Sequence, residues 1–192
     1  MAKGSTQTYG IDYLETFAPM AKMTTSRVLL SLASCYSWEL MQLDVKNAFL
    51  HGDLEEEVFM DPQPGFSNEV ASYVCKLKNA LYGLKQSSRA WFDRFSRAMK
   101  AMGYWQSRGD HTLFMKHSKK GTLITLLVYV DDIIVTRNDE DEKKLLKGNL
   151  AREFDIKDPG RLKYFLGIEV VYSKEGIFLS QRKYTMDLLE KT

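Results

Sequence analysis

Apolar residues at helical spacing predict two helices in the first half of the chain. The clearer one begins at Ser87 or Ser88 and is followed by a capping glycine; its apolar stripe consists of Ala90, Trp91, Phe95, Ala98, Met99 and Met102. An earlier helix is expected to run to Cys35 from a threonine cap, Thr24 or Thr25, with an apolar side made of Val28, Leu29, Leu32 and Tyr36.

Two more helices are predicted in the second half. The first has Asn138 or Asp139 as its expected cap and carries the apolar residues Leu145, Leu146, Leu150 and Phe154. The second begins after Ser180 and continues toward residue 192.

Runs of β-forming residues predict strands, and two of these runs carry acids at their ends. Residues 39–45 are typical of a short strand with Asp44 near its end. Residues 123–130 and 133–136 predict a buried hairpin whose bend holds Asp131 and Asp132. Further strands are expected at 58–60, 74–77, 164–171 and 177–180. Together the elements predict an α+β fold with an antiparallel sheet backed by helices.

Composition argues against several classes of protein. Of the 192 residues, 44% are hydrophobic and only two are cysteines, so low-complexity disorder, a disulfide scaffold and a structural zinc site are poorly supported. Neither a signal peptide nor a membrane-spanning segment is found, which favours a cytoplasmic protein with no membrane partner.

The charge is distributed unevenly along the chain. The net charge is +2, but residues 76–120 contain eleven Lys or Arg and two Asp, a local balance of +9. Aromatic residues are interleaved with these cations, as on surfaces that bind a phosphate backbone. A solvated helix face is the alternative explanation.

Asp131 and Asp132 need a chemical explanation more than any other pair. Asp is common in turns, so the pair alone is ordinary. Two adjacent carboxylates between apolar strands, however, repel each other and lose solvation, which is costly unless a cation balances them. Asp44 is the best third acid because it also ends an apolar strand. If the strands are neighbours, the three carboxylates can hold two Mg²⁺ ions about 3.5–4 Å apart for a phosphoryl transfer.

Ordered sequence blocks extend this interpretation to the whole chain. The blocks are Thr6–Tyr13, Glu15–Pro19, Leu43–Gly52, Leu81–Ser87, Tyr129–Asp132 and Tyr164–Val170. In this order they resemble the reverse transcriptase of copia-type LTR retrotransposons, which is part of the Pol polyprotein. The resemblance covers essentially all 192 residues. It implies a right-hand polymerase fold in which the chain supplies the palm and part of the fingers.

The resemblance also implies a division of the chain. Residues 1–40 would be partial fingers, and residues 41–180 the palm with a finger insertion around 53–85. Residues 181–192 would begin a following region that is truncated, with the thumb missing.

The activity implied by the resemblance is that of an RNA-directed DNA polymerase. A primer 3′-hydroxyl would attack the α-phosphate of a nucleotide, and pyrophosphate would leave. Asp44, the Val45 carbonyl, Asp131 and Asp132 would hold two Mg²⁺ ions, with Mn²⁺ as an alternative. Positioning and charge neutralisation would do most of the catalytic work.

Other positions match residues that contact nucleic acid in this family. Phe49 resembles the steric gate that excludes ribonucleotides; a core Phe on a strand is the alternative. Leu166 and Gly167 resemble the primer grip, with a Gly-containing strand as the alternative. The nucleotide- and template-binding block would act through Tyr82, Gly83, Lys85 and Gln86. For Lys85, a solvated surface charge is the alternative.

The implied partners are an RNA or DNA template with its primer, deoxynucleoside triphosphates, and the integrase and RNase H parts of Pol. The implied location is a cytoplasmic virus-like particle. The family's finger Arg, expected before Ala2, is absent. A catalytically silent remnant that at most binds nucleic acid is therefore an alternative. A two-metal nuclease is a weaker one, with His51 as its only candidate for activating water.

Overall fold

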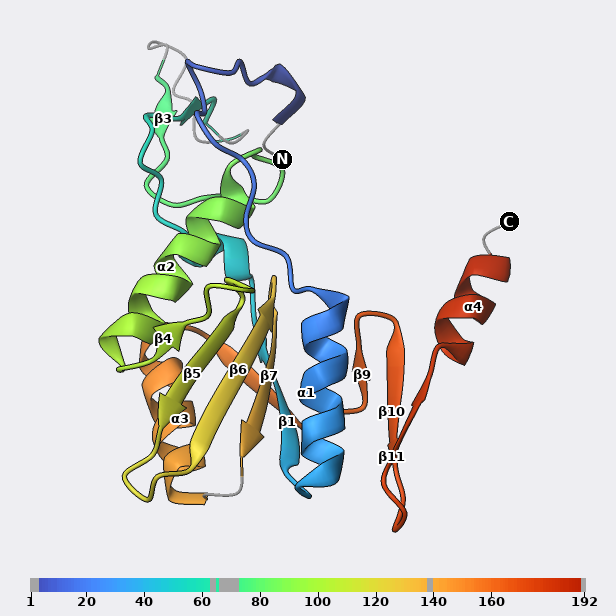
Figure 1. Ribbon diagram of the computed structural model, residues 1–192. Coiled ribbons are helices and arrows are strands. Elements are labelled where there is room, and N and C mark those ends of the chain that lie inside the picture. The colour runs from blue at the N-terminus through green and yellow to red at the C-terminus, as the bar shows by residue number, and fades with distance from the viewer. Residues whose placement is uncertain (1–3, 63–64, 66–72, 138–139, 191–192) are drawn as a thin grey trace. The chain divides into compact units, whose positions relative to one another are not determined.

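The computed structural model of the protein describes residues 4–62, 65, 73–137 and 140–190, which fall into two compact units. One unit consists of Met1–Pro19 and Asn47–Ala101, and the other of Met20–Lys46 and Met102–Thr192. The larger unit holds an antiparallel sheet with helices packed on it, which confirms the predicted α+β class (Figure 1).

The sheet of the larger unit has six strands in the order β4-β5-β6-β7-β1-β8, and each neighbouring pair is antiparallel. The strands are β4 (Trp105–Gln106), β5 (Leu113–His117), β6 (Leu123–Tyr129), β7 (Asp132–Arg137), β1 (Glu39–Val45) and β8 (Ile156–Arg161). The predicted strand at 39–45 and the predicted hairpin are thus both confirmed, and the two are neighbours.

Two helices flank this sheet. Figure 1 shows α1 (Met23–Cys35) in front of the sheet and α3 (Glu140–Glu153) behind it. The predicted apolar side of α1 is correct only at Leu29, because Val28, Leu32 and Tyr36 are exposed. Together with Leu29 the helix buries Ser26, Leu30 and Ala33. Leu29, Leu30 and Ala33 pack with Leu40, Leu127 and Ile134 of the sheet.

The start of α1 also differs from the prediction. The helix begins at Met23, and its N-cap residue Lys22 makes no side-chain cap hydrogen bond. Asp110, far away in sequence, takes this role by accepting a 3.1 Å hydrogen bond from the Lys22 backbone N–H. The expected caps of α3, Asn138 and Asp139, lie outside the described residues.

A second sheet of the larger unit has the order β11-β10-β9, with β9 (Tyr164–Phe165), β10 (Ile168–Tyr172) and β11 (Ile177–Ser180). The single strand predicted at 164–171 is therefore wrong, since a hairpin turn at Leu166 and Gly167 divides it. These two residues have φ of 50° and 78°, the left-handed values that tight hairpin turns require. Phe165, Ile168 and Val170 join the core under α1. The helix α4 (Arg182–Leu189) follows.

The smaller unit is built around α2 (Ser87–Ala101), which begins where predicted and buries Trp91, Phe95 and Met99 of the predicted stripe. It also contains two 3₁₀ turns, η1 (Gly4–Thr6) and η2 (Ala48–His51), and the short pair β2 (Phe59–Met60) and β3 (Cys75–Lys76). Gly52 follows η2 at a position where a Cβ would lie 2.7 Å from the Trp91 backbone nitrogen. This glycine lets η2 approach α2 closely.

Candidate active site

The acids predicted from the sequence occupy adjoining positions at one end of the six-stranded sheet. Asp44 is directly opposite Asp132 in the register of β1 and β7, and Tyr129 is opposite Asp132 in the register of β6 and β7. The Val45 backbone N–H donates a 2.8 Å hydrogen bond to the Asp131 carbonyl. The antiparallel pairing thus brings together two segments that are almost ninety residues apart in the chain.

The bend between β6 and β7 has an unusual backbone. It consists of Val130 and Asp131, and Val130 has a φ of 55°. A left-handed φ is rare for a β-branched residue and indicates local strain. Such strain persists where the surrounding structure holds it in place, and it is frequent at functional sites. Here the paired strands β6 and β7 on both sides hold the bend, which contains Asp131 and is followed by Asp132.

Asp132 is half-buried among negative charges. Burial raises the pKa of Asp132; a 2.9 Å hydrogen bond from Gln42 Nε2 opposes the rise, and the charges of Asp131 and Asp44 add to it. The net effect is a pKa above the ordinary value, because ionised Asp132 loses solvation and is repelled by its neighbours. A bound cation would offset both of these costs.

The three acids are suited to a metal by type and backbone position. Carboxylates and a nearby backbone carbonyl are ligands that Mg²⁺ prefers. Their side chains, however, are not arranged as a metal centre. Within residues 4–62, 65, 73–137 and 140–190, no group of three or more His, Cys, Asp or Glu is arranged to hold a metal ion.

Phe49, the predicted steric gate, lies in the smaller unit on η2 and not on a strand. Its ring packs against the ring of Tyr82, with centroids 4.7 Å apart. Phe49 is half-buried and Tyr82 is exposed, so this pair joins two of the predicted nucleotide-site residues at the surface of the unit. The unit also contains His51, which packs against Trp91 at 6.0 Å.

The block that contains Gly83, Lys85 and Gln86 forms a turn before α2. Gly83 has a φ of 102°, and a Cβ on Gly4 would lie 2.3 Å from the Gly83 oxygen, so the N-terminal segment passes very close to this turn. Lys85 is exposed, whereas Gln86 is 2% exposed and buried beneath the turn. The two neighbours therefore have different environments.

Leu166 and Gly167, the predicted primer grip, form the tip of the β9–β10 hairpin in the larger unit. Gly167 lies against Tyr184 of α4, where an added Cβ would be 3.3 Å from the ring. The two residues thus present turn backbone and not strand backbone.

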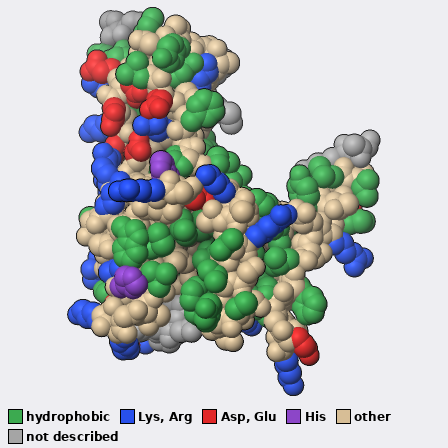
Figure 2. Space-filling view, in the orientation of Figure 1, with side chains coloured by type: hydrophobic (Ala, Val, Ile, Leu, Met, Phe, Trp, Pro, Cys, Tyr) green, Lys and Arg blue, Asp and Glu red, His purple; other side chains and the backbone are tan. Residues whose placement is uncertain are grey.

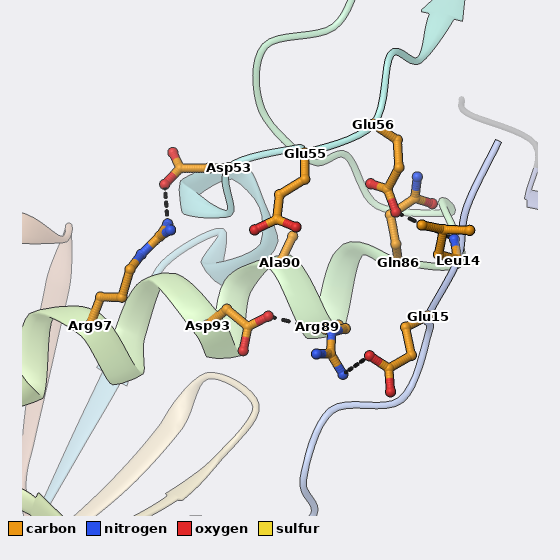
Figure 3. A pocket seen from close by; sticks show the side chains of 10 residues that line it. All are labelled: Leu14, Glu15, Asp53, Glu55, Glu56, Gln86, Arg89, Ala90, Asp93 and Arg97. Atoms are coloured by element: carbon orange, nitrogen blue, oxygen red, sulfur yellow. Dashed lines mark hydrogen bonds and ion pairs between the residues drawn. The ribbon is translucent and has the colours of Figure 1, made fainter. Parts of the chain in front are cut away.

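Several arginines of the basic stretch are engaged by acids of the same unit. Figure 3 shows Arg89 between Glu15 and Asp93, and Arg97 reaching Asp53 along the side of α2. The Arg89–Glu15 distance is 2.6 Å and the Arg97–Asp53 distance is 2.5 Å. Figure 2 shows acidic and basic side chains side by side on the visible face of this unit. These arginines are thus part of a mixed-charge network.

Sequence reasoning missed two kinds of contributor to these sites. Gln42 binds Asp132 from the same face of β1 as Asp44, and its position two residues before Asp44 was the available signal. Gln7 and Tyr13 contact the turn at Lys85, and no local pattern indicates this, because about seventy residues separate them from it.

Comparison with known proteins decides the family. A family model described as reverse transcriptase (RNA-dependent DNA polymerase) matches residues 1–192. The chain belongs to this reverse transcriptase family. Its relatives include the retrovirus-related Pol polyproteins from transposons RE1 and RE2 of Arabidopsis thaliana, at 45% and 44% identity over all of this chain. A third, from transposon TNT 1-94 of Nicotiana tabacum, is 43% identical over all of it.

These relatives are much longer than this reverse transcriptase chain. The match covers 13% of the RE1 and RE2 polyproteins and 15% of the TNT 1-94 polyprotein. The predicted resemblance to copia-type Pol polyproteins is confirmed.

In the part of the chain that is described, no helix has the length and apolar character needed to cross a membrane.

Proposed function

We propose that this chain is the palm and part of the fingers of an RNA-directed DNA polymerase that acts by a two-metal mechanism. The observation that carries the proposal is the pairing of Asp44 with Asp132 across β1 and β7. It gathers acids from two separate blocks at one end of a buried sheet, next to a strained bend. Membership of the reverse transcriptase family supports the reaction class.

In this proposal the chain's own groups position the reactants and balance charge. Asp44, Asp131 and the Val45 carbonyl bind the metal ions, while Asp132 contributes from the facing strand. Two Mg²⁺ ions, when bound, neutralise charge on the attacking 3′-hydroxyl and on the pyrophosphate that leaves. Gln42 orients Asp132 through its hydrogen bond, which holds one carboxylate oxygen of Asp132 in place.

The remaining predicted site residues bind the nucleic acid and the nucleotide. Phe49 and Tyr82 form the wall against which the sugar of a deoxynucleotide packs, and Phe49 excludes a 2′-hydroxyl by its bulk. Gly83 and Lys85 contact template or nucleotide, and Leu166 and Gly167 support the primer end. Gln86 is buried, so it supports the turn that carries Gly83 and Lys85 and does not contact the nucleic acid itself.

The proposal should be tested in a longer protein, because this chain spans only about an eighth of the length of the relatives from transposons RE1 and RE2. We therefore propose to measure primer extension on an RNA template, with Mg²⁺ or Mn²⁺, in a longer protein that carries the flanking Pol segments. Asp44→Asn and Asp131→Asn keep side-chain volume and remove charge. Each is expected to reduce extension by about a hundred- to a thousand-fold, which is the scale for removing one group that stabilises the transition state.

The control is Asp141→Asn, which neutralises an exposed acid of α3 that pairs with Lys120. It is expected to leave extension unchanged. Extension that persists in Asp44→Asn and Asp131→Asn would refute the assignment of these acids. Binding of nucleic acid with a steep dependence on salt, but without any incorporation by the wild type, would favour the silent remnant.

A further inference from the structure

Gln86 has an environment unlike that of the exposed residues beside it. Its side chain is 2% exposed, and both ends of its carboxamide are engaged. Nε2 donates a 2.9 Å hydrogen bond to the Asp12 carbonyl, and Oε1 accepts a 2.9 Å hydrogen bond from Gln7 Nε2. A buried polar side chain that is fully satisfied in this way fixes its neighbours firmly, because breaking either bond leaves an unpaired buried group.

Gln7 carries the connection onward to Lys85. Its Oε1 accepts a 2.8 Å hydrogen bond from the Lys85 backbone N–H, so both ends of this second carboxamide are also used. The two glutamines therefore form one chain of hydrogen bonds from the Asp12 carbonyl to the Lys85 backbone. This chain joins the N-terminal segment to the turn before α2.

The side chain of Lys85 is held by the same segment. Its ammonium donates to the Tyr13 hydroxyl at 3.1 Å and to the Gln7 carbonyl at 3.4 Å, and it lies 4.8 Å from the centre of the Tyr13 ring. Lys85 nevertheless remains exposed, and none of these partners carries a negative charge. A lysine side chain normally samples many rotamers, so holding it costs entropy that must be offset by these contacts.

We propose that Gln7, Tyr13 and Gln86 are positioning residues for Lys85, whose ammonium binds a phosphate group of the polymerase's substrates. The inference rests on the proposed function and adds a role for the N-terminal segment. A cation that is held in place before the ligand arrives loses less entropy on binding, which strengthens the interaction. The neutral partners fix its position and leave its charge available for the phosphate.

Two sources of that phosphate can be separated by kinetics in the longer, active protein. If the phosphate belongs to the incoming nucleotide, Lys85→Ala raises KM for the deoxynucleoside triphosphate by about ten-fold and changes kcat by less than about two-fold. If it belongs to the template strand, the same variant weakens binding of the primer–template duplex by a similar factor. An effect on neither quantity overturns the proposal.

The positioning role is tested in combination with Lys85→Ala. Gln86→Met keeps the length and apolar packing of the buried side chain but removes both hydrogen bonds, and Tyr13→Phe removes only the hydroxyl. Each alone is expected to weaken the same quantity as Lys85→Ala. In the Lys85→Ala background neither should have a further effect, because both act through the ammonium. Effects that simply add would show a general loss of structure and overturn the proposal.

A readout without catalysis keeps this inference separate from the proposed function. Hydrogen exchange of the Lys85 amide is expected to quicken in Gln86→Met, because Gln7 is no longer held in place. The matched control is Gln106→Ala, which removes another carboxamide hydrogen bond, to the His111 carbonyl at 2.7 Å. Unchanged exchange in Gln86→Met overturns the positioning role, whereas a wild type that incorporates no nucleotide overturns the proposed polymerase function.

Discussion

Asp44 lies directly opposite Asp132 across the β1–β7 ladder. Residues in such pairs point to the same face of a sheet with their Cβ atoms about 5 Å apart, and like charges there are destabilising. Folding therefore places two carboxylates where they repel each other, while Asp131 adds a third charge beside them. Such an arrangement is expected at a site that binds a cation. The stabilising interactions of the rest of the fold offset the repulsion when no cation is bound.

The first prediction is that Asp132→Asn stabilises the metal-free protein. The pKa of Asp132 is raised in the folded state, so its charged form costs stability that is absent at low pH and grows as pH rises past the unfolded value. The neutral amide removes this cost, which is about 1 kcal/mol or less because the site is partly solvated. Urea unfolding at pH 7 in EDTA measures it.

The matched control for that experiment is Asp158→Asn. Burial opposes ionisation of Asp158, but its ion pair with Lys147 and the Gly160 backbone N–H outweigh burial and lower the pKa. Its neutralisation should therefore destabilise the protein. In addition, Mg²⁺ should stabilise the wild type more than Asp132→Asn. A less stable Asp132→Asn protein in EDTA would contradict the repulsion argument.

The second prediction concerns Phe49 and the choice of sugar. Replacing Phe49 with Val removes most of the ring that packs against Tyr82. The ratio of kcat/KM for deoxynucleotides to that for ribonucleotides is expected to fall by about ten-fold or more, since selectivity against an added hydroxyl depends on the bulk that meets it. Phe59→Val, at an exposed Phe on β2, should leave the ratio unchanged. An unaltered ratio in Phe49→Val would remove the steric-gate role.

The third prediction concerns Asp110 and the start of α1. Burial acts to raise the pKa of Asp110, but hydrogen bonds from Thr112, Thr25 and the Lys22 backbone together lower it. The resulting stability is present above the unfolded pKa and is lost as pH falls through the lowered folded pKa. Asp110→Ala should destabilise the protein at pH 7 by about 1–3 kcal/mol.

The pH dependence supplies the control for Asp110. The difference in unfolding free energy between wild type and Asp110→Ala should shrink on acidification below the ordinary carboxyl value of 3.8. A difference that stays constant down to the acid transition would show that the charge of Asp110 is not what holds Lys22.

The fourth prediction uses two glycines with opposite surroundings. Gly52→Ala places a Cβ 2.7 Å from the Trp91 nitrogen and 2.8 Å from the Ala90 carbonyl carbon, so η2 and α2 must separate. We expect a loss of about 2 kcal/mol or more. Gly148→Ala, in the exposed part of α3 with nothing within 4 Å, should instead stabilise by up to about 1 kcal/mol. Equal effects in thermal unfolding would contradict the packing argument.

Some strands and faces escaped prediction for identifiable physical reasons. The strand β8 contains Pro159 and Gly160, which normally indicate a turn, but an edge strand tolerates both because one side of its backbone needs no partner. The apolar side of α1 was predicted correctly only at Leu29, because Val28 and Leu32 are at least as hydrophobic as the residues that are buried. Only the position of the sheet decides which side of the helix is covered.

By itself, the sequence determined the elements whose pattern is local: the strand ending at Asp44, the hairpin around Asp131 and Asp132, and the stripe of α2. It also determined the family, because ordered blocks survive in the chain regardless of how they pack. The tertiary structure alone decided that Asp44 faces Asp132, that Asp110 caps α1 and that Gln7 and Gln86 join the N-terminal segment to Lys85. These contacts connect residues separated by about seventy to ninety positions, and the geometry of strand pairing and burial, not any local pattern, selects them.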